Sequence, residues 1–112
     1  MDDRMSEGEY QEMRDVIDEL SPIWTMRDGR TIAVVDMEDS HVMNALAMVK
    51  RQEQGLQLIL GVCEDYMREA EESNDRLGYM IAADSADPIR KQLTHKRYWI
   101  RIFTLELERR AR

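Results

Sequence analysis

The chain has 112 residues, which is room for one domain over residues 1–112. Hydrophobic residues make up 43% and charged residues 35% of the sequence, a balance typical of amphipathic helices and unlike that of a disordered chain. A single cysteine, Cys63, excludes an internal disulfide. The formal net charge of −7 opposes binding to duplex nucleic acid, because like charges repel at long range.

No apolar run approaches the roughly 20 residues that a transmembrane helix requires. Residues 1–4, Met-Asp-Asp-Arg, lack the basic-then-apolar order of a signal peptide. We therefore expect a cytoplasmic protein that does not enter a membrane. Its charge is unevenly spread: residues 1–22 hold eight carboxylates and two arginines, whereas residues 88–112 hold eight Lys and Arg and two carboxylates. These opposite charges can attract within one chain or between copies.

Residues 6–20 are expected to form a short amphipathic helix. Ser6 and Glu9 have the spacing of a capping box, and apolar residues recur every three or four positions after them. Pro22 ends this helix, because proline cannot continue a helix and restricts the residue before it.

Residues 23–35 predict a β-hairpin. Asp28-Gly29 is typical of a two-residue turn with positive φ at both positions, and Trp24 and Met26 alternate with polar residues on the first strand. A two-stranded hairpin is only marginally stable by itself in water. Its apolar face must therefore pack on helices of the same chain or on the sheet of a partner.

A long helix is expected over residues 39–80, with Asp36, Asp39 and Ser40 available to cap its start. Its apolar positions step by three and four in alternation, which is the heptad spacing of helices that pack together. This first series is Leu46, Val49, Glu53, Leu56, Leu60, Cys63, Met67, Ala70, Asn74 and Leu77.

We expect a short linker at residues 84–86 and a second long helix over residues 87–110. Asp87 would cap this helix and Pro88 would occupy its first position. The heptad series of this helix is Ile89, Leu93, Lys96, Ile100, Phe103, Leu107 and Arg110. Four further apolar residues widen the same face: Tyr98, Trp99, Ile102 and Leu105.

These elements predict a mainly α protein with a small β-hairpin, an α+β fold built around a long antiparallel helical hairpin. At ~1.5 Å per residue, residues 40–78 would span roughly 60 Å, whereas a compact chain of this size has a radius of gyration of about 13 Å. A helix of this length exposes its seam unless copies pair, so we expect a homo-oligomer. The residues expected to carry the oligomer seam are Leu46, Leu56, Leu60, Ile100, Phe103 and Leu107.

The sequence holds no nucleophile elbow, phosphate-binding loop, dinucleotide fingerprint or zincin helix, so we assign no catalytic residue and no cofactor. A di-metal helical bundle needs Glu-x-x-His on paired helices, and Glu38 and His41 form one such pair without a second. One enzyme hypothesis is a metal-dependent nucleotide hydrolase with Glu64, Asp65, Glu69 and Glu72 as Mg²⁺ ligands. A solvated acidic helix face is the simpler interpretation of these four residues.

Tyr98 and Trp99 lie between Lys96-Arg97 and Arg101, and such a mixture of cations and aromatic rings can bind phosphates and stack on bases. The start of the first long helix also favours anions. The candidate residues for binding a small anionic nucleotide are His41, Asn44, Arg97 and Arg101. In the structural alternative, Trp99 belongs to the core and the helix-start residues only fix the corner between strand and helix.

The hairpin residues Trp24, Thr25, Asp28, Gly29, Arg30 and Ile32 are followed at the helix start by Asp36, Met37, Asp39, Ser40, His41, Asn44 and Ala45. This pattern, within residues 24–51, resembles small proteins of bacteriophages and prophages whose function is not established. The resemblance implies that Ser40 caps the helix and that His41 and Asn44 face the hairpin. A phage origin would suit an antagonist of host defence that sequesters a nucleotide signal or blocks a host protein.

We therefore expect a non-enzymatic, oligomeric helical binding protein. The metal-dependent hydrolase is one alternative. A structural or assembly component of a virion is another, and it would associate in an open-ended or partner-dependent manner instead of forming a closed oligomer.

Overall fold

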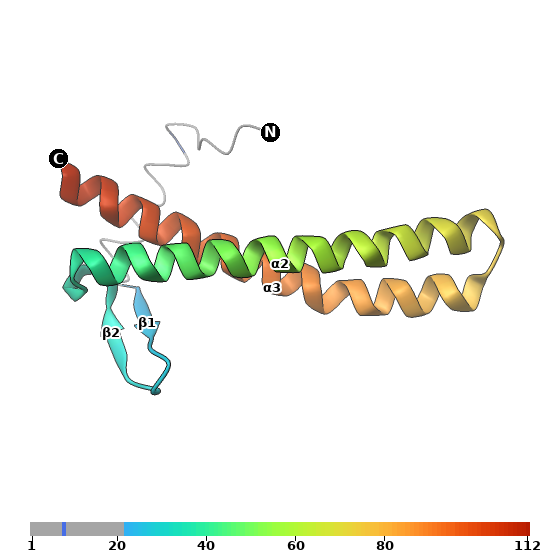
Figure 1. Cartoon of the computed structure of the whole chain (residues 1–112), viewed down its shortest axis with the longest axis horizontal. Helices are drawn as coiled ribbons and strands as arrows, with labels where there is room; N and C mark the ends of the chain where they lie inside the picture. The colour runs from blue at the N-terminus through green and yellow to red at the C-terminus, as the bar shows by residue number, and fades with distance from the viewer. Residues whose placement is uncertain (1–7, 9–21) are drawn as a thin grey trace. The chain divides into compact units, whose positions relative to one another are not determined.

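The structure, a computed structural model, describes Gly8 and residues 22–112 (Figure 1). The helix expected over residues 6–20 therefore lies outside the described residues, apart from Gly8. The elements are β1 (Ile23–Thr25), β2 (Thr31–Ala33), the 3₁₀ turn η1 (Val34–Asp36), α2 (Asp39–Glu72) and α3 (Arg76–Ala111). The predicted fold class is confirmed: the chain is mainly helical, with a two-stranded antiparallel sheet and two long helices that form a hairpin.

The chain divides into two compact units. Unit 1 joins the chain up to Ala47 with residues 99–112, and unit 2 is residues 48–98. Both helices contribute to both units, because α2 begins in unit 1 and ends in unit 2, while α3 does the reverse.

The β-hairpin of unit 1 has a longer turn than expected. Thr25 pairs with Thr31, and the N–H of Met26 donates to the carbonyl of Arg30 at 2.7 Å, which leaves three loop residues instead of two. The two-residue turn with two positive φ angles was therefore a wrong prediction, since only Gly29 adopts a positive φ, of 88°, in this loop. A three-residue loop with glycine at its last position is the next commonest hairpin connection.

The hairpin of unit 1 packs on a helix of its own chain. The ring of Trp24 on β1 meets the rings of Trp99 and Phe103 on α3 edge to face, with centroids 5.0 and 5.1 Å apart. Val34 from η1 and Val42 from α2 are fully buried in the same unit. Of the two predicted ways of covering the apolar face of the hairpin, the structure therefore uses the helices of the same chain.

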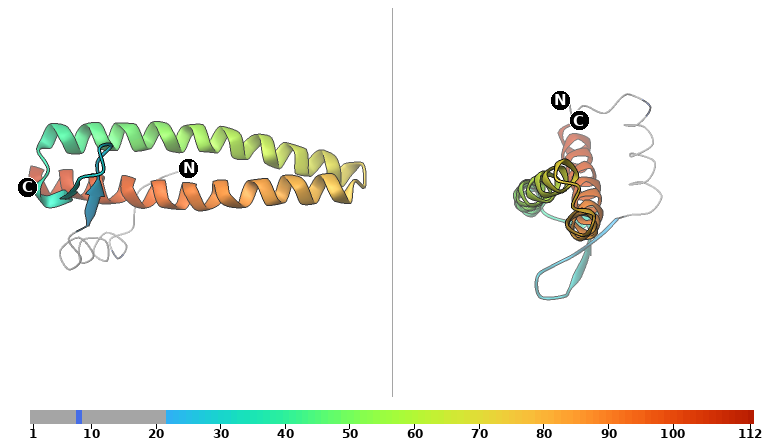
Figure 2. Two further views of the ribbon diagram at one scale, coloured as in Figure 1. Left: turned by 90° about the horizontal axis from the view of Figure 1, so that it is seen from below. Right: turned by 90° about the vertical axis from the view of Figure 1, so that its right-hand side faces the viewer.

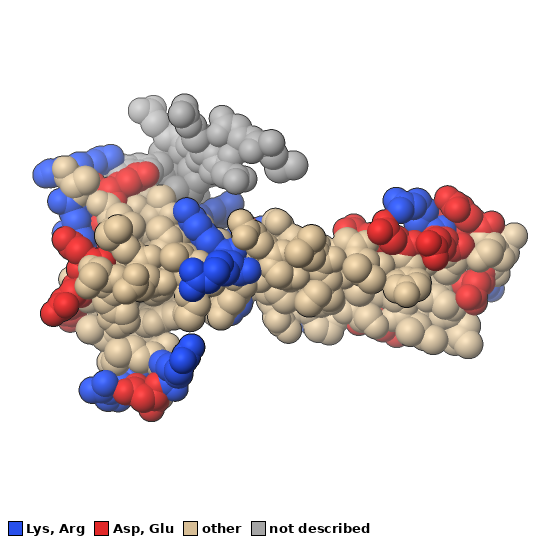
Figure 3. Space-filling model, in the orientation of Figure 1, with Lys and Arg blue, Asp and Glu red and all other residues tan. Residues whose placement is uncertain are grey.

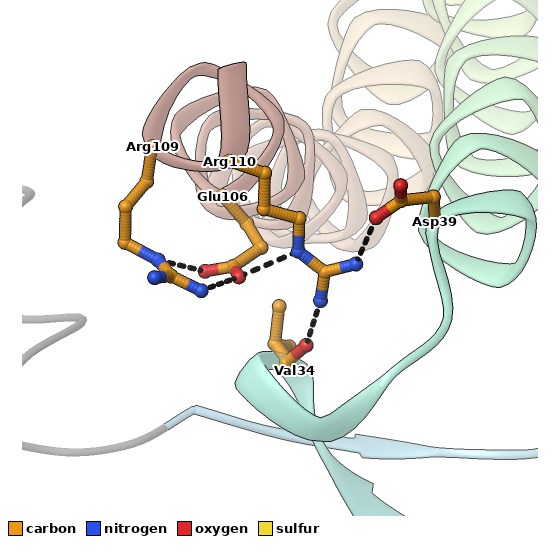
Figure 4. A network of polar contacts seen from close by, with 5 residues as sticks. All are labelled: Val34, Asp39, Glu106, Arg109 and Arg110. Carbon is orange, nitrogen blue, oxygen red and sulfur yellow. Dashed lines mark hydrogen bonds and ion pairs between the residues drawn. The ribbon is translucent and has the colours of Figure 1, made fainter. Parts of the chain in front are cut away.

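A charged network closes unit 1 near the chain's carboxyl end (Figure 4). The side chain of Glu106 is fully buried and accepts hydrogen bonds from both Arg109 and Arg110, the latter at 2.8 Å from its Nε. The remaining nitrogens of Arg110 donate to Asp39 Oδ1 at 2.7 Å and to the carbonyl oxygen of Val34 at 3.1 Å. One guanidinium thus connects the end of α3 to the start of α2 and to η1.

The net effect of this network is to lower the pKa of Glu106. Burial by itself would raise the pKa of this carboxyl, but the hydrogen bonds and positive charges of Arg109 and Arg110 outweigh burial. The pKa of Arg110 is raised, chiefly by its hydrogen bond to Glu106. Both shifts stabilise the charged pair in the folded chain.

In unit 2, α2 and α3 run side by side and antiparallel (Figure 2). The residues of the first heptad series within this unit, from Val49 to Ala70, are buried or half-buried at every position. The same holds for the second series from Ile89 onward. Glu53, the polar member of the first series, accepts a hydrogen bond from Nε of Arg97 on the opposite helix at 3.4 Å.

The predicted bounds of the two helices, 39–80 and 87–110, were wrong at the connection between them. The turn lies at residues 73–75, and α3 continues through the expected linker at 84–86 and through Pro88. Ala82 and Ala86 are buried and extend the second series backward in the same steps of three and four. Pro88 is exposed and has no N–H, so its presence removes one helix hydrogen bond without disturbing the buried seam.

Local hydrogen bonds explain why the chain turns at residues 73–75. Asn74 adopts a left-handed φ of 56°, and the N–H of Asp75 donates to the carbonyl of Ala70 at 2.8 Å, as in a Schellman C-cap. The carboxylate of Asp75 then accepts the N–H of Gly78 at 2.9 Å and caps the start of α3. A Cβ at Gly78 would collide with this carboxylate, which fits the absence of a side chain there.

We predict that Asn74→Ala lowers the free energy of unfolding by about 1 kcal/mol, because alanine is strained in the left-handed region. Asn74→Gly should leave this free energy unchanged or raise it. Glu71→Ala, an exposed change within regular helix, is the matched control and should not destabilise. Urea denaturation at one fixed protein concentration measures all three, and equal stability of the alanine and glycine variants at position 74 would contradict the turn.

Glu106 should make the stability of unit 1 depend on pH. Because its folded pKa is lowered, its contribution is complete above about pH 5 and is lost as the pH falls through the lower folded pKa. Glu106→Gln should therefore cost about 2 kcal/mol at pH 7 and flatten the loss of stability toward pH 3. The exposed neighbour provides the control, since Glu108→Gln should keep the parent's pH dependence. Parallel curves for all three proteins would show that the network is not formed.

Candidate functional site

Unit 2 exposes large apolar side chains along one stretch of α2. Leu58 is 75% exposed, Ile59 53%, Val62 54% and Tyr66 62%. Full burial of a Leu, Ile or Val side chain is worth about 1.5–3 kcal/mol, so covering the exposed half of each would contribute about 1 kcal/mol. Scattered exposed apolar residues are ordinary, but a contiguous group of them is typical of an interaction surface.

The spacing of these residues places them beside the buried seam and not within it. The seam of α2 takes one set of positions three and four apart, including Leu56, Leu60 and Cys63. Ile59, Val62 and Tyr66 follow the same steps but are offset from that seam by one residue, so they form a second stripe on an adjacent part of the helix surface. α3 covers the first stripe and leaves the second exposed within unit 2.

α3, the second helix of the helical hairpin, also exposes large apolar side chains next to those of α2. Ile81 is 60% exposed and lines, with Val62 and Tyr66, an open groove between the two helices of about 560 Å³. Small residues form part of its wall and floor, namely Cys63, Ala70, Ser73, Gly78, Ala82 and Ser85. Leu77, 69% exposed, lies one turn before Ile81 on α3. We call this surface, made by Leu58, Ile59, Val62, Tyr66, Leu77 and Ile81, the apolar face.

A second, smaller groove of about 350 Å³ lies at the turn. Ala70, Tyr79 and Met80 supply its apolar part, and its polar residues are Glu71, Asn74, Asp75 and Arg76. Tyr79 and Met80 are 38% and 59% exposed. Exposed apolar side chains in unit 2 therefore extend from the middle of α2 to the turn.

Charges divide unit 2 into two halves of opposite sign. The turn half, residues 63–87, holds eight carboxylates and two arginines, a net charge of −6. The open half, residues 48–62 and 88–98, holds six Lys and Arg and one carboxylate, a net charge of +5. Figure 3 shows one side of the molecule, where uncharged surface separates acidic side chains near the turn from basic side chains farther along.

The residues predicted to bind a nucleotide are divided between the two units. His41 is half-buried and Asn44 and Arg101 are exposed in unit 1, whereas Arg97 belongs to unit 2 and pairs with Glu53. Nucleotide binding at these four residues stays a prediction.

The carboxylates of the hydrolase hypothesis, Glu64, Asp65, Glu69 and Glu72, are all exposed. Asp65 accepts a hydrogen bond from Arg68 at 2.5 Å. Across residues 22–112, no group of three or more His, Cys, Asp and Glu side chains is arranged to hold a metal ion. Their exposure agrees with the simpler interpretation from the sequence, an acidic helix face in contact with solvent.

Within the single chain, one of the six residues predicted for an oligomer seam is buried and five are half-buried, and their part in association stays a prediction. Phe103 is fully buried, and Leu46, Leu56, Leu60, Ile100 and Leu107 are half-buried. More exposed apolar side chains lie on the stripe that contains Ile59, Val62 and Tyr66. The sequence contains the signal for this stripe, since its steps of three and four run parallel to the first series, but only the structure shows which of the two α3 covers.

Comparison with protein-family models, curated proteins and solved structures gives no significant match to this chain. The resemblance of residues 24–51 to phage and prophage proteins therefore stays a prediction. In the described part of the chain, neither long helix contains an apolar stretch that would let it cross a bilayer.

Proposed function

We propose that this chain is a non-enzymatic helical binding protein that self-associates through the apolar face of unit 2. The observation that supports this proposal is the exposure of Leu58, Ile59, Val62 and Tyr66 on consecutive turns of one rigid helix. An interaction surface built on a helix needs little ordering when a partner binds, so less of the binding energy is lost to conformational entropy.

The chemistry of the apolar face favours a protein partner over a small ligand. The six side chains of the face are aliphatic apart from Tyr66, and its open groove is lined by the carboxylates Glu69 and Asp75 but by no Lys or Arg that could hold a phosphate. A facing helix that carries its own apolar stripe would match this surface, because helices pack by interleaving side chains spaced three and four apart.

A broader hypothesis places this association in the cytoplasm of a bacterial host, where a phage-encoded oligomer would block a host defence component. It rests on the sequence resemblance of residues 24–51. The self-association proposed here is independent of that resemblance and can be tested without it.

The test is the molar mass in solution of the parent and of an Ile59→Gln, Val62→Gln variant, measured by light scattering after size exclusion at 5–500 µM, concentrations chosen to bracket roughly micromolar affinity. The parent should associate as concentration rises. The variant should stay monomeric with the same helix content, because both positions are exposed and surface changes alter stability by about 0.5 kcal/mol or less.

Leu93→Gln is the contrasting control, since Leu93 is 2% exposed and its loss should destabilise the fold by about 2–5 kcal/mol. A parent that remains monomeric across the whole concentration range would overturn the proposed function. Association that the Ile59→Gln, Val62→Gln variant retains would show that another surface carries it.

A further inference from the structure

We propose that the apolar face is occupied by α2 of a second copy that runs antiparallel, about a two-fold axis near residues 60 and 61. This inference rests on the proposed self-association and adds its geometry. Three independent features of unit 2 support it: the order of residues along the exposed stripe, a glycine that faces the right position, and the division of charge between the two halves of the unit.

The spacing of residues along the exposed stripe of α2 is the same in both directions. The stripe comprises Gln52, Gly55, Ile59, Val62, Tyr66 and Glu69, which are separated by three, four, three, four and three residues. An antiparallel copy reverses this order and reproduces the same spacing. A two-fold symmetric interface requires such self-complementarity, because the same patch must fit itself.

The antiparallel register places matching side chains opposite one another. Ile59 of one copy meets Val62 of the other, which forms an aliphatic centre with two symmetric contacts. Gln52 meets Glu69, so an amide faces a carboxylate instead of one carboxylate facing another. A parallel copy would instead place Glu69 against Glu69 and Tyr66 against Tyr66.

The same register places Tyr66 over Gly55 of the second copy. Gly55 is exposed in the middle of α2, and a Cβ built there would have no atom of its own chain within 4 Å. Glycine inside a helix costs about 1 kcal/mol relative to alanine, and no contact among the described residues requires it here. A large ring from a second helix supplies the reason, because it can approach a backbone that carries no side chain.

The charges of unit 2 oppose a parallel pair and favour an antiparallel one. With the axis near residues 60 and 61, the turn half of one copy, at −6, lies beside the open half of the other, at +5. Both contacts are therefore attractive. A parallel pair would bring together the two acidic halves and the two basic halves.

Two charged side chains at the edge of the stripe, Arg51 and Glu72, would form ion pairs between the two antiparallel copies. Arg51 and Glu72 both belong to the row seven residues apart that includes Leu58 and Asp65 and that borders the stripe on its outer side. Reversal of α2 brings Arg51 of one copy near Glu72 of the other, twice per dimer. Both side chains are exposed, and among the described residues neither forms an ion pair within the chain.

The glycine gives the sharpest test. Gly55→Gln should weaken the dimer at least tenfold, as measured by the dissociation constant from sedimentation equilibrium, while the helix content of the monomer stays the same or rises. Gly61→Gln is the matched control, because Gly61 also has open space at its Cβ position but lies two residues from Ile59, about 200° around the helix. It should leave the dissociation constant within about twofold of the parent value.

A charge exchange tests the direction of the second copy. Arg51→Glu and Glu72→Arg should each weaken the dimer by about tenfold, and the double variant should recover most of that loss because it restores both ion pairs. Lys50→Glu makes the same change of charge on another side of α2, because Lys50 lies two residues before Gln52. As the control, it should weaken the dimer less than Arg51→Glu does. A parallel dimer predicts no recovery in the double variant.

The outcomes separate this inference from the function on which it rests. A monomeric parent overturns both. A dimer that Ile59→Gln, Val62→Gln dissociates but that tolerates Gly55→Gln and shows no recovery in the charge exchange keeps the proposed function and overturns the antiparallel arrangement. Weakening by Gly55→Gln together with recovery in the double charge variant supports the arrangement.

Discussion

The contact on which the rest of the molecule depends is the apolar seam between α2 and α3. A helix of 34 residues and one of 36 residues do not persist in water through helix propensity alone, and most of their stability must come from packing of an amphipathic side. In unit 2 this packing uses a single stripe on each helix. Everything else that is apolar on those helices must find a second partner or stay in contact with water, and Val62 and Tyr66 are the clearest cases.

In unit 1 the apolar side chains of the helices are covered by the β-hairpin as well as by the facing helix. The short β-hairpin contributes Trp24 to an aromatic cluster with Trp99 and Phe103, so the apolar width of α3 is used inside the chain. The buried Glu106 is held by two arginines, one of which also reaches the start of α2. Removal of one member of such a network leaves a buried charge without its partner, which destabilises the arrangement of the elements that the network joins.

Much of the fold could be predicted from the sequence, because heptad spacing is a local pattern. The predicted series residues from Val49 to Ala70 on α2, and from Ile89 onward on α3, are buried or half-buried in the structure. The predicted turn was wrong, since Asp87-Pro88 is a typical helix start and Asn74 fits the heptad series equally well. The position of the turn depends on the left-handed φ of Asn74 and on the cap that Asp75 provides for α3. The spacing of apolar residues carries no information about either feature.

The candidate site was less predictable for a related reason. Both stripes of α2 have the same spacing, and the sequence favoured Leu56 and Leu60 as the surface for a second copy. In the structure Leu56 and Leu60 are half-buried, whereas Ile59, Val62 and Tyr66 are exposed, and this difference follows only from knowing how the two helices face each other. The role of Gly55 is likewise hidden in the sequence, where a helical glycine is equally compatible with a bend, a close approach or no function.

The measurement that addresses the central claim most directly is amide hydrogen exchange of the parent chain at about 1 µM and at about 200 µM, on either side of micromolar affinity. If a second copy covers the apolar face, amides of residues 55–66 should exchange more slowly at the higher concentration, because opening that stretch would first require dissociation. Amides of residues 27–29, in the exposed loop of the β-hairpin in unit 1, should exchange at the same rate at both concentrations, because they exchange without unfolding of the chain. Equal rates for residues 55–66 at the two concentrations would contradict the account.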